Sequence, residues 1–579
     1  MNNVKSTFRA LFASIRSAAR RGAPPFPVGI ALSTAAALFA AAAATLAPVS
    51  LAAQEGPLTT AESSGFKATS RHADVMRFIA ELQGQSPLIR VESMAVSFEG
   101  RDVPLVIIGD PVPYYPAELR HDDRTVVYFQ ANIHAGEVEG KEAAQMLARD
   151  IVRGKTADYL DELVILICPN FNPDGNEKIS TDNRTRQVGP EQGVGIRYNG
   201  QNLDLNRDGM KLETPEVRGL IENVLMRWDP LFFLDSHTHN GSYHQEPVTW
   251  TWGLNPNGDA AILEYMEHEL LPDITSRMTE AYQVPTVPHG DFLDVKEPEK
   301  GWVAHGPEPR YLINYVGLRN RFSILNEQYP YVDFETRVQG CYKLFLAFLD
   351  HIHANRNEME ALAREADRET VARGGDPAEG DAFIVEYDRR ALDRRLTILG
   401  YEMEVTEREG TRPLVRPTEV ERVYKDVPYF ARYAPKRTVG FPRGYLINVH
   451  AEAALENLLR HGIIVEELVE PAVLEVESFT VTHIEGSERP NQGHYTSTVE
   501  GDYATTEMEF PEGTLFVATA QPLGRLAAYL LEPESGDGLV AWNFFDRYLA
   551  AQWGNRPQTY PVYKLYEAAN MAKRRLPRE

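Results

Sequence analysis

Hydrophobic and polar positions change in blocks along the chain, and the blocks predict strands and helices in turn. Short, continuous apolar runs are typical of strands that are buried on both faces, and they cover residues 103–110, 125–134, 163–171, 231–237 and 321–327. Between these runs, apolar residues recur three and four positions apart, which predicts helices over residues 139–154, 213–228 and 260–274. The alternation predicts an α/β fold, in which a mixed and mostly buried sheet is flanked by helices on both faces.

The pattern changes after a long predicted helix that begins near Phe334. This helix stops at Gly374-Gly375-Asp376-Pro377, a strong stop signal. Residues 381–440 are charged and give no clear periodicity, and the strand and helix patterns beyond them predict a second mixed α/β domain without an evident catalytic cluster. We therefore predict a catalytic domain, a linker and an accessory domain, over residues 54–360, 361–380 and 381–579.

The first 53 residues predict an export signal. They contain basic but no acidic residues, and an uncharged, Ala- and Leu-rich run from Gly22 to Gln54 follows Arg20 and Arg21. Small residues crowd its end at Ser50-Leu51-Ala52-Ala53, as at a cleavage site. Because the run is long enough to span a bilayer, an uncleaved anchor is the alternative. We expect the mature protein in a periplasm or outside the cell, without stable membrane association after cleavage.

Composition and charge exclude several classes of protein. The 579 residues are 43% hydrophobic and 25% charged, as in soluble globular chains and unlike disordered, collagen-like or multi-span membrane chains. A net charge of −24 repels phosphates, so a nucleic-acid partner is not expected. The two cysteines, Cys168 and Cys341, lie among apolar neighbours and are predicted to be buried hydrophobes, since two cysteines cannot form a thiolate zinc site or a disulfide framework.

Candidate metal ligands stand where two of the predicted strands end. One strand runs into His134-Ala-Gly-Glu137, and a predicted helix begins immediately afterwards. Another ends in Asp235-Ser-His237-Thr-His239, where alternate side chains share a face. Open α/β sheets place their ligand sites at such strand ends. Together these residues can supply three ligands to one cation and leave a fourth position for water.

Two further groups suit carboxylate binding and proton transfer. The Asn206-Arg207 pair can hold a carboxylate, because a guanidinium binds it with two parallel hydrogen bonds. Glu327 ends an apolar strand, and partial desolvation there raises the pKa of a carboxyl, which suits a general base. We expect the nearby Glu335 to lie instead at the N-terminus of the following helix.

Taken in order, these motifs resemble those of zinc carboxypeptidases of the carboxypeptidase A type. The ordered set is His134-x-x-Glu137, Asn172-Pro173-Asp174-Gly175, Asp204-Leu205-Asn206-Arg207, His237 and Glu327, preceded by Ser97-Phe98-Glu99-Gly100-Arg101. The resemblance covers about residues 65–355 and implies the zinc-carboxypeptidase fold for that part of the chain.

The resemblance also implies a role for each matching residue. His134, Glu137 and His237 would bind one Zn²⁺, Asp204 would orient His134, and Glu327 would act as general base and acid. Asn206 and Arg207 would hold the terminal carboxylate of a peptide substrate. The family has a carbonyl-polarising arginine, for which we prefer Arg184 over Arg186, and a mobile tyrosine, for which Tyr311 and Tyr315 are the candidates.

The predicted function is thus an exported zinc-dependent carboxypeptidase. A zinc amidase or deacylase, or a cell-wall peptide hydrolase, on the same fold is an alternative, since the Asn206-Arg207 pair suits any substrate with a free carboxylate. A non-catalytic peptide-binding module is a third hypothesis. Glu327 argues against it, because a structural zinc site closes its fourth position with a protein ligand.

Overall fold

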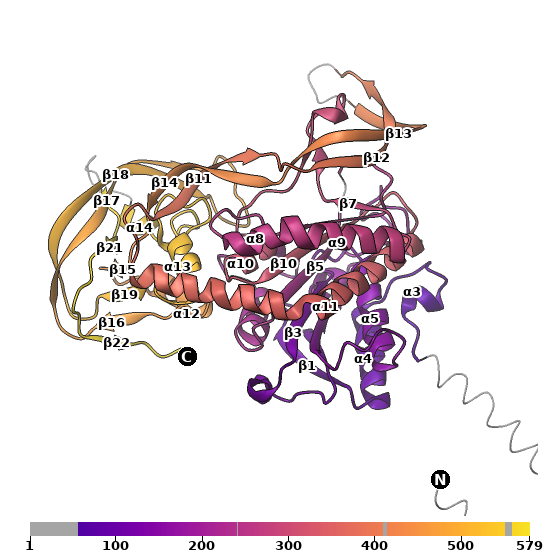
Figure 1. The fold of residues 1–579 in the computed structure, drawn as a ribbon, viewed down its shortest axis with the longest axis horizontal. Helices are drawn as coiled ribbons and strands as arrows, with labels where there is room; N and C mark the ends of the chain where they lie inside the picture. The colour runs from indigo at the N-terminus through magenta and orange to yellow at the C-terminus, as the bar shows by residue number, and fades with distance from the viewer. Residues whose placement is uncertain (1–55, 240, 409–413, 550–557, 579) are drawn as a thin grey trace, which may run out of the picture. The chain divides into compact units, whose positions relative to one another are not determined.

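The computed structural model of the protein describes residues 56–239, 241–408, 414–549 and 558–578. A mixed eight-stranded sheet forms the centre of its N-terminal half (Figure 1). Its strands are β1 (Ile89–Val96), β2 (Asp102–Ile108), β3 (Thr125–Ala131), β4 (Leu163–Cys168), β5 (Phe232–Thr238), β6 (Val248–Trp252), β7 (Thr286–Pro288) and β10 (Phe322–Gln328). They follow the order β1-β2-β4-β3-β5-β10-β6-β7. Strands β4, β3, β5 and β10 run parallel, so their carboxyl ends meet at one edge. The five predicted strands are confirmed.

Helices cover both faces of this sheet, as predicted. Alternate residues of β3 point to opposite faces, because side chains alternate along a strand. Val127 and Phe129 share a core with α4 (His72–Gln85), α5 (Glu139–Val152) and α11 (Phe334–Gly375). Tyr128 shares a second core with α7 (Pro215–Leu220) and α10 (Leu312–Gly317). The α/β fold class is confirmed.

The other helical segments of this half are short. They are α3 (Thr60–Ser63), η1 (Pro116–His121), α6 (Pro173–Asn176), η2 (Leu205–Arg207), η3 (Ile221–Leu225), α8 (Ala260–Tyr265), η4 (Met266–Leu270), α9 (Leu271–Ser276), η5 (Arg277–Ala281) and η6 (Pro298–Lys300). The predicted helix over residues 260–274 is thus a chain of four consecutive segments that continues to Ala281. The single-turn segments α6 and η2 carry the NPDG and LNR motifs to the same sheet edge.

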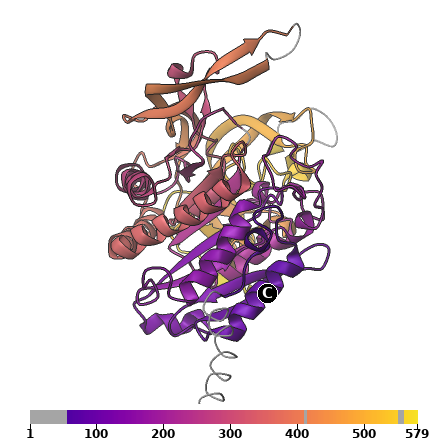
Figure 2. The ribbon, with the colours of Figure 1, turned by 90° about the vertical axis from the view of Figure 1, so that its right-hand side faces the viewer.

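Residues 381–440, which have no clear periodicity, form four strands: β11 (Ala382–Arg390), β12 (Arg395–Thr406), β13 (Leu414–Phe430) and β14 (Arg432–Gly440). The first half of β13 is exposed or half-buried, so no apolar face marks it in the sequence. β12 and β13 pair antiparallel, and their hairpin projects from the rest of the ribbon (Figure 2). β13 also pairs with β9 (Trp302–Val303), which pairs with β8 (Asp291–Phe292).

The last part of the chain is β-rich, with helices packed against a second sheet. This sheet has the order β18-β17-β21-β15-β19-β16-β22, and β20 pairs with β17. Its elements are β15 (Gly444–Ile447), α12 (Glu452–Arg460), β16 (Glu466–Leu468), β17 (Ala472–Gly486), β18 (Ser497–Phe510), β19 (Leu515–Ala518), α13 (Gly524–Leu531), α14 (Asp546–Leu549), β20 (Gln558–Thr559), β21 (Val562–Leu565) and β22 (Lys573–Arg575). The predicted second mixed domain is confirmed in its fold class.

The two parts share one hydrophobic core within the compact unit that residues 57–579 form. Tyr128 and Phe233 of the first sheet belong to the same buried cluster as Tyr445 and Leu526 of the second part. Helix α11 lies beside α5 and reaches α13 (Figure 1), so residues 361–375 of the predicted linker are helical. The division at residues 360 and 381 stays a prediction.

The predicted export signal over residues 1–53 lies outside the described residues. Among the helices of the described ranges, none combines the length and the apolar character that crossing a bilayer requires.

Candidate functional site

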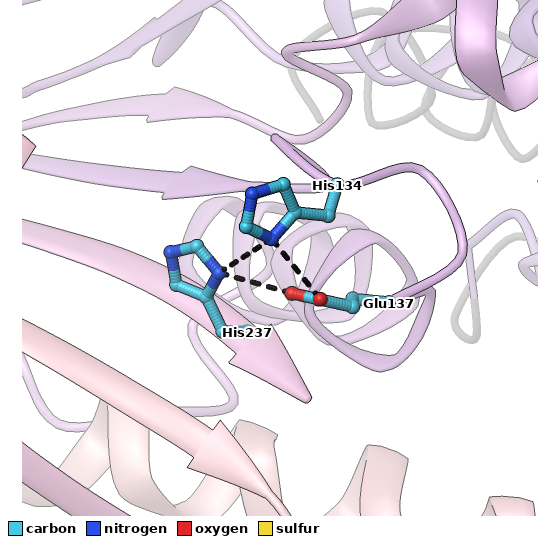
Figure 3. A group of neighbouring side chains, drawn as sticks. All are labelled: His134, Glu137 and His237. Atoms are coloured by element: carbon cyan, nitrogen blue, oxygen red, sulfur yellow. Dashed lines mark hydrogen bonds and ion pairs between the residues drawn. The ribbon is translucent and has the colours of Figure 1, made fainter. Parts of the chain in front are cut away.

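Three buried side chains converge where β3 and β5 end (Figure 3). His134 and Glu137 lie in the turn between β3 and α5, and His237 lies near the end of β5. The Nδ1 atoms of the two histidines are 3.2 Å apart, and they lie 3.0 and 2.9 Å from the two carboxylate oxygens of Glu137. A possible ligand atom from each residue lies within 4.8 Å of the others, so this set can hold a metal ion.

Two aspartates fix the orientation of the imidazoles. His134 Nε2 lies 2.9 Å from Asp204 Oδ1, and His237 Nε2 lies 2.9 Å from Asp235 Oδ2. Because an ionised carboxylate only accepts hydrogen bonds, each histidine donates through Nε2, and with a metal ion bound its Nδ1 would offer that ion a lone pair. A carboxylate that binds the other ring nitrogen of a metal-binding histidine sets its tautomer. Gln130 donates to Asp235 across 3.1 Å and thereby holds Asp235 in place beside His237.

The converging lone pairs require a positive charge between them. Although burial lowers the pKa of His237, the carboxylates of Asp235 and Glu137 raise it well above its ordinary value, so a cation is favoured at this point. Two nitrogens bound tetrahedrally to zinc at about 2.0–2.1 Å lie about 3.3 Å apart, close to the 3.2 Å between the Nδ1 atoms. The donor set and its spacing fit zinc with an open coordination position.

Arg184 reaches this cluster from the loop that follows the NPDG motif. Its guanidinium pairs with Glu137 and donates from Nη1 to the Thr238 carbonyl across 3.2 Å. The approach requires a glycine at position 136, because a Cβ there would lie 2.7 Å from Arg184 Nε. Burial raises the pKa of Glu137, but His134 and Arg184 lower it more, and the net shift is well below its ordinary value.

Glu327 lies on β10 beside His237, its register partner on β5. Its Oε2 atom is buried and has no hydrogen-bond partner among the described residues. Burial raises its pKa to about 8, and the Glu137 carboxylate adds to that rise against the opposing charges of His237 and Arg184. A carboxyl with an unused oxygen in this position can take up and release a proton.

Arg207 and Tyr311 stand on the far side of the same space. The guanidinium carbon of Arg207 lies 4.4 Å from the centre of the Tyr311 ring, a cation–π contact, and Arg207 Nη1 donates to the Asn206 carbonyl across 2.7 Å. Asn206 Oδ1 accepts from the Leu312 amide at 2.9 Å. The side chain of Arg207 is 25% exposed, so its remaining N–H groups are available to a ligand.

These groups line one cavity of about 240 Å³. The cavity contains the predicted site residues His134, Glu137, Arg184, Asn206, Arg207, His237, Tyr311 and Glu327. Arg186 lines a separate hollow with Tyr331, and Tyr315 is buried with its hydroxyl 2.9 Å from His461. Glu335 is exposed in the first turn of α11.

Three ionisable residues of the cavity wall are not among the candidates named from the sequence: Arg197, His289 and His305. Arg197 Nε donates to Asp204 across 2.7 Å, and its Nη1 lies 3.8 Å from Glu137. All three lie in loops or beside very short strands, outside any motif. The nearest signal in the sequence is the position of Arg197 in the run that leads to the Asp204 motif.

The β-rich part of the chain holds the loop that carries Arg207. Gln492, between β17 and β18, accepts a hydrogen bond from the Asp204 amide at 2.7 Å. Asn457 of α12 donates to the carbonyls of Met210 and Lys211, each at 3.0 Å. Asp537 accepts from the backbone and side chain of Arg310, next to Tyr311. The positions of Arg207 and Tyr311 therefore depend on this second part.

We expect Asn457→Ala to raise KM several-fold while changing kcat less, because the loop that carries Arg207 loses two hydrogen bonds. The free energy of unfolding should fall by about 1–3 kcal/mol, since two buried carbonyls lose their donor. Steady-state kinetics with thermal unfolding measure both. In the control Asn355→Ala, the removed amide donates to the His351 carbonyl of α11, and KM should not change. An unchanged KM in a destabilised Asn457→Ala protein would contradict the role of this contact in positioning Arg207.

Glu327→Gln should stabilise the metal-free protein at alkaline pH. The folded-state pKa of about 8 lies above the ordinary 4.5, so the unfolded chain loses its proton first and stability falls as pH rises from 4.5 to 8. The free energy of unfolding should fall by about 1.4 kcal/mol per pH unit, and by at most about 5 kcal/mol in total. Unfolding of chelator-treated protein at pH 5 and pH 8.5 measures the difference, with Glu335→Gln as the exposed control. If Glu327→Gln stabilised the protein equally at both pH values, the raised pKa of Glu327 would be refuted.

Some known proteins are similar to the first part of this chain, and others align with most of its length. Residues 75–244 match the family model described as zinc carboxypeptidase. A protein named Carboxypeptidase 2 from Trichophyton rubrum is 22% identical over 88% of this chain and 89% of its own length. Its namesake from Trichophyton equinum is 23% identical over 81% of each chain.

Solved metallo-carboxypeptidases align over about half of the chain. The enzyme from Burkholderia cenocepacia has 18% identity and a TM-score of 0.36 over 49% of this chain and 69% of its own. Carboxypeptidase A from Helicoverpa armigera has 17% identity and a TM-score of 0.37 over 54% of this chain and 78% of its own.

Proposed function

We propose that the chain is a peptidase of the carboxypeptidase A type, which removes single C-terminal residues from peptides with a zinc ion held by His134, Glu137 and His237. The match of residues 75–244 to the zinc carboxypeptidase family model supports this proposal. One observation carries the proposal. The metal-binding cluster, the carboxyl of Glu327 and the guanidinium of Arg207 face a single cavity of about 240 Å³. Such a cavity suits the last residue of a chain, whose carboxylate and scissile bond need these groups at the same time.

The substrate is positioned through its terminal carboxylate. Arg207 would pair with it, and the Tyr311 ring under the guanidinium keeps that side chain at the cavity wall. Asn206 fixes the loop by accepting from the Leu312 amide. The scissile carbonyl, one residue away, then lies toward Arg184, whose N–H groups can donate to its oxygen as negative charge develops there.

Zinc bound to the three ligands would supply Lewis acidity to a water molecule and to the carbonyl oxygen. Glu327 accepts the proton of the attacking water at its unpaired Oε2 and passes it to the leaving amine. Asp204 and Asp235 hold the two histidines in the tautomer that keeps Nδ1 free for the metal. With a metal ion bound to the three ligands, its positive charge would lower the pKa of Glu327, so that Glu327 would be in its base form before attack.

Blocked dipeptides that differ in their C-terminal residue test the activity. We expect release of the free C-terminal amino acid, and no cleavage of internal bonds in longer peptides. Cleavage of internal bonds would favour an endopeptidase on this fold. Cleavage of blocked amino acids alone would favour the amidase or deacylase alternative.

The purified protein should contain about one zinc ion per chain, because two imidazoles and a carboxylate with an open position favour zinc over magnesium or calcium. Treatment with a chelator should abolish activity, and zinc should restore it. Elemental analysis together with the dipeptide assay measures both. Full activity in a metal-free preparation would contradict the assignment.

We further propose that the protein is exported. The basic N-terminal residues, the uncharged apolar run to Gln54 and the small residues at its end support a cleaved signal. N-terminal sequencing of the protein from the extracellular or periplasmic fraction should give a start after Ala53. A start at the initiator methionine would favour the retained anchor.

A further inference from the structure

Two histidines of the cavity wall have hydrogen-bonding groups that the protein does not use. Both ring nitrogens of His305 are buried and lack a partner among the described residues. A neutral imidazole always offers one donor and one acceptor, and leaving buried groups of this kind unpaired is unfavourable. The ring edge packs against Tyr311, with centroids 6.2 Å apart. His305 thus lines the cavity with two ring nitrogens that have no partner among the described residues.

The tautomer of His289 follows from its neighbours. Its Nδ1 lies 3.1 Å from Thr249 Oγ1, and the Thr249 hydroxyl donates its single hydrogen to the Glu327 carbonyl across 3.2 Å. The hydroxyl oxygen must then accept from His289, which donates through Nδ1. This leaves Nε2 of His289 as an acceptor without a partner among the described residues, on a ring that lines the cavity.

The short β8–β9 hairpin brings the two histidines together. Its register pairs Asp291 with Val303, and two further steps along the same register place residue 289 opposite residue 305. The backbone on both sides is held, because Tyr429 donates to the His289 carbonyl at 3.0 Å and Tyr433 donates to the His305 carbonyl at 2.9 Å. The pair therefore presents an acceptor from His289 next to a donor or acceptor from His305.

The third additional histidine of the wall is fully used within the protein. His239 Nδ1 accepts from the Gly241 amide at 2.9 Å, so its Nε2 donates to His244 Nε2 at 3.0 Å. Both of its nitrogens are paired. Recognition of a ligand therefore falls to His289 and His305, which we call the histidine pair.

The charges around the histidine pair disfavour a basic side chain, and its hydrogen-bonding groups disfavour a carboxylate. The cavity wall includes Arg184, Arg197 and Arg207, and its carboxylates, Glu137 and Glu327, belong to the metal cluster and the proton transfer. A basic side chain would thus be surrounded by cations without a free acid. Burial lowers the pKa of His289 to about 4 and that of His305 to about 3, so both imidazoles are neutral near pH 7. A carboxylate side chain has no hydrogen to give to His289 Nε2.

We propose that the histidine pair recognises a carboxamide, so that the protein prefers substrates whose C-terminal residue is asparagine or glutamine. This inference rests on the proposed function, because Arg207 must hold the terminal carboxylate for the side chain to reach the pair. The amide N–H of the substrate donates to His289 Nε2, and its carbonyl oxygen accepts from the N–H of His305. Ile313 and Leu325 of the same wall contact the aliphatic part of the side chain.

The test compares kcat/KM for blocked dipeptides that end in residues of similar shape, asparagine with leucine and glutamine with methionine. Because the apolar member leaves both histidines unpaired, we expect the carboxamide to be preferred by about 10- to 100-fold. Aspartate and lysine should be cleaved more slowly than asparagine. Equal cleavage of asparagine and leucine, or faster cleavage of leucine, would overturn the inference.

Variants assign the preference to the histidine pair. His305→Phe keeps a ring against Tyr311 and should reduce the preference to less than about 3-fold. His305→Gln should restore part of it. The control His353→Phe alters a similar edge contact with Tyr159 and should leave the carboxamide preference unchanged. If His305→Phe does not fold, His289→Phe tests the same expectation, and an unaltered preference in a folded variant would contradict the role of the pair.

Two outcomes separate this inference from the proposed function. Cleavage of all free acids at similar rates would remove the carboxamide preference and leave the carboxypeptidase activity. If no free acid is cleaved, the proposed function fails, and calorimetry of the zinc-loaded protein with the free amino acids decides the inference. Asparagine should then bind at least about 10-fold more tightly than leucine; equal binding would overturn it.

Discussion

Replacing Glu327 by glutamine should lower kcat by at least ~100-fold, the usual scale for loss of general acid–base catalysis, while the zinc content stays the same. The substitution keeps the shape of the side chain and removes the group that accepts the proton. Glu327 is not among the three residues whose ligand atoms converge, so the metal should bind as before. Steady-state kinetics with elemental analysis on the same preparation measure both quantities.

The matched control for this prediction is Glu335→Gln. Glu335 lies eight positions further along the chain, exposed at the start of α11, and its replacement should leave kcat unchanged. Near-normal turnover in Glu327→Gln would mean that another group carries the proton. Loss of zinc together with activity would mean that Glu327 supports the metal instead.

Amidation of the substrate's C-terminus should weaken cleavage strongly if Arg207 pairs with a free carboxylate. Loss of one partner from a desolvated charge pair typically costs ~2–5 kcal/mol, or about 30- to several-thousand-fold in kcat/KM. Arg207→Ala should produce a similar loss on the free acid. It should cause little further loss on the amide, because the two changes delete the same interaction.

The coupling between these two changes is the informative quantity. Either change alone could weaken catalysis by altering the charge of the cavity, which already contains Arg184 and Arg197. Arg186→Ala is a suitable control, because Arg186 lines a different hollow and should show no coupling with amidation. Equal cleavage of acid and amide by the unmodified protein would refute the exopeptidase proposal. The zinc ligands and Glu327 would be unaffected by that result.

The second part of the chain affects how such variants are interpreted. Asn457, Gln492 and Asp537 all contact the segments that carry the Arg207 and Tyr311 side chains. A substitution far from the cavity in sequence can therefore change KM without touching the substrate. Truncation before residue 381 would remove these contacts and expose the core that both parts share, so it would not isolate a working catalytic domain.

The sequence by itself determined the α/β class and the central strands. β3, β4 and β5 are buried on both faces, so their residues form apolar runs that can be recognised locally. It also determined His134, Glu137, Asp204, Arg207 and Glu327 as candidates, because they stand in motifs at strand ends and turns, whose direction follows from the alternation of side chains.

Only the tertiary structure decided which of several equivalent residues reach the cavity. Arg184 and Arg186 are two positions apart in one loop, and Tyr311 and Tyr315 lie on either side of the start of α10. Their directions are set by loop geometry and by contacts with segments far away in sequence. Tyr315, for example, is drawn into the core by His461, 146 positions further along the chain.

The remaining features had no local signal at all. β11–β14 are not predicted by the sequence analysis, and the exposed first half of β13 has no buried face that could mark it as a strand. His289 and His305 come together only through the register of a hairpin with two-residue strands, and the backbone at both histidines is held by tyrosines more than a hundred positions away. Contacts of this kind are stabilised by the packing of distant segments, and that packing exists only in the folded chain.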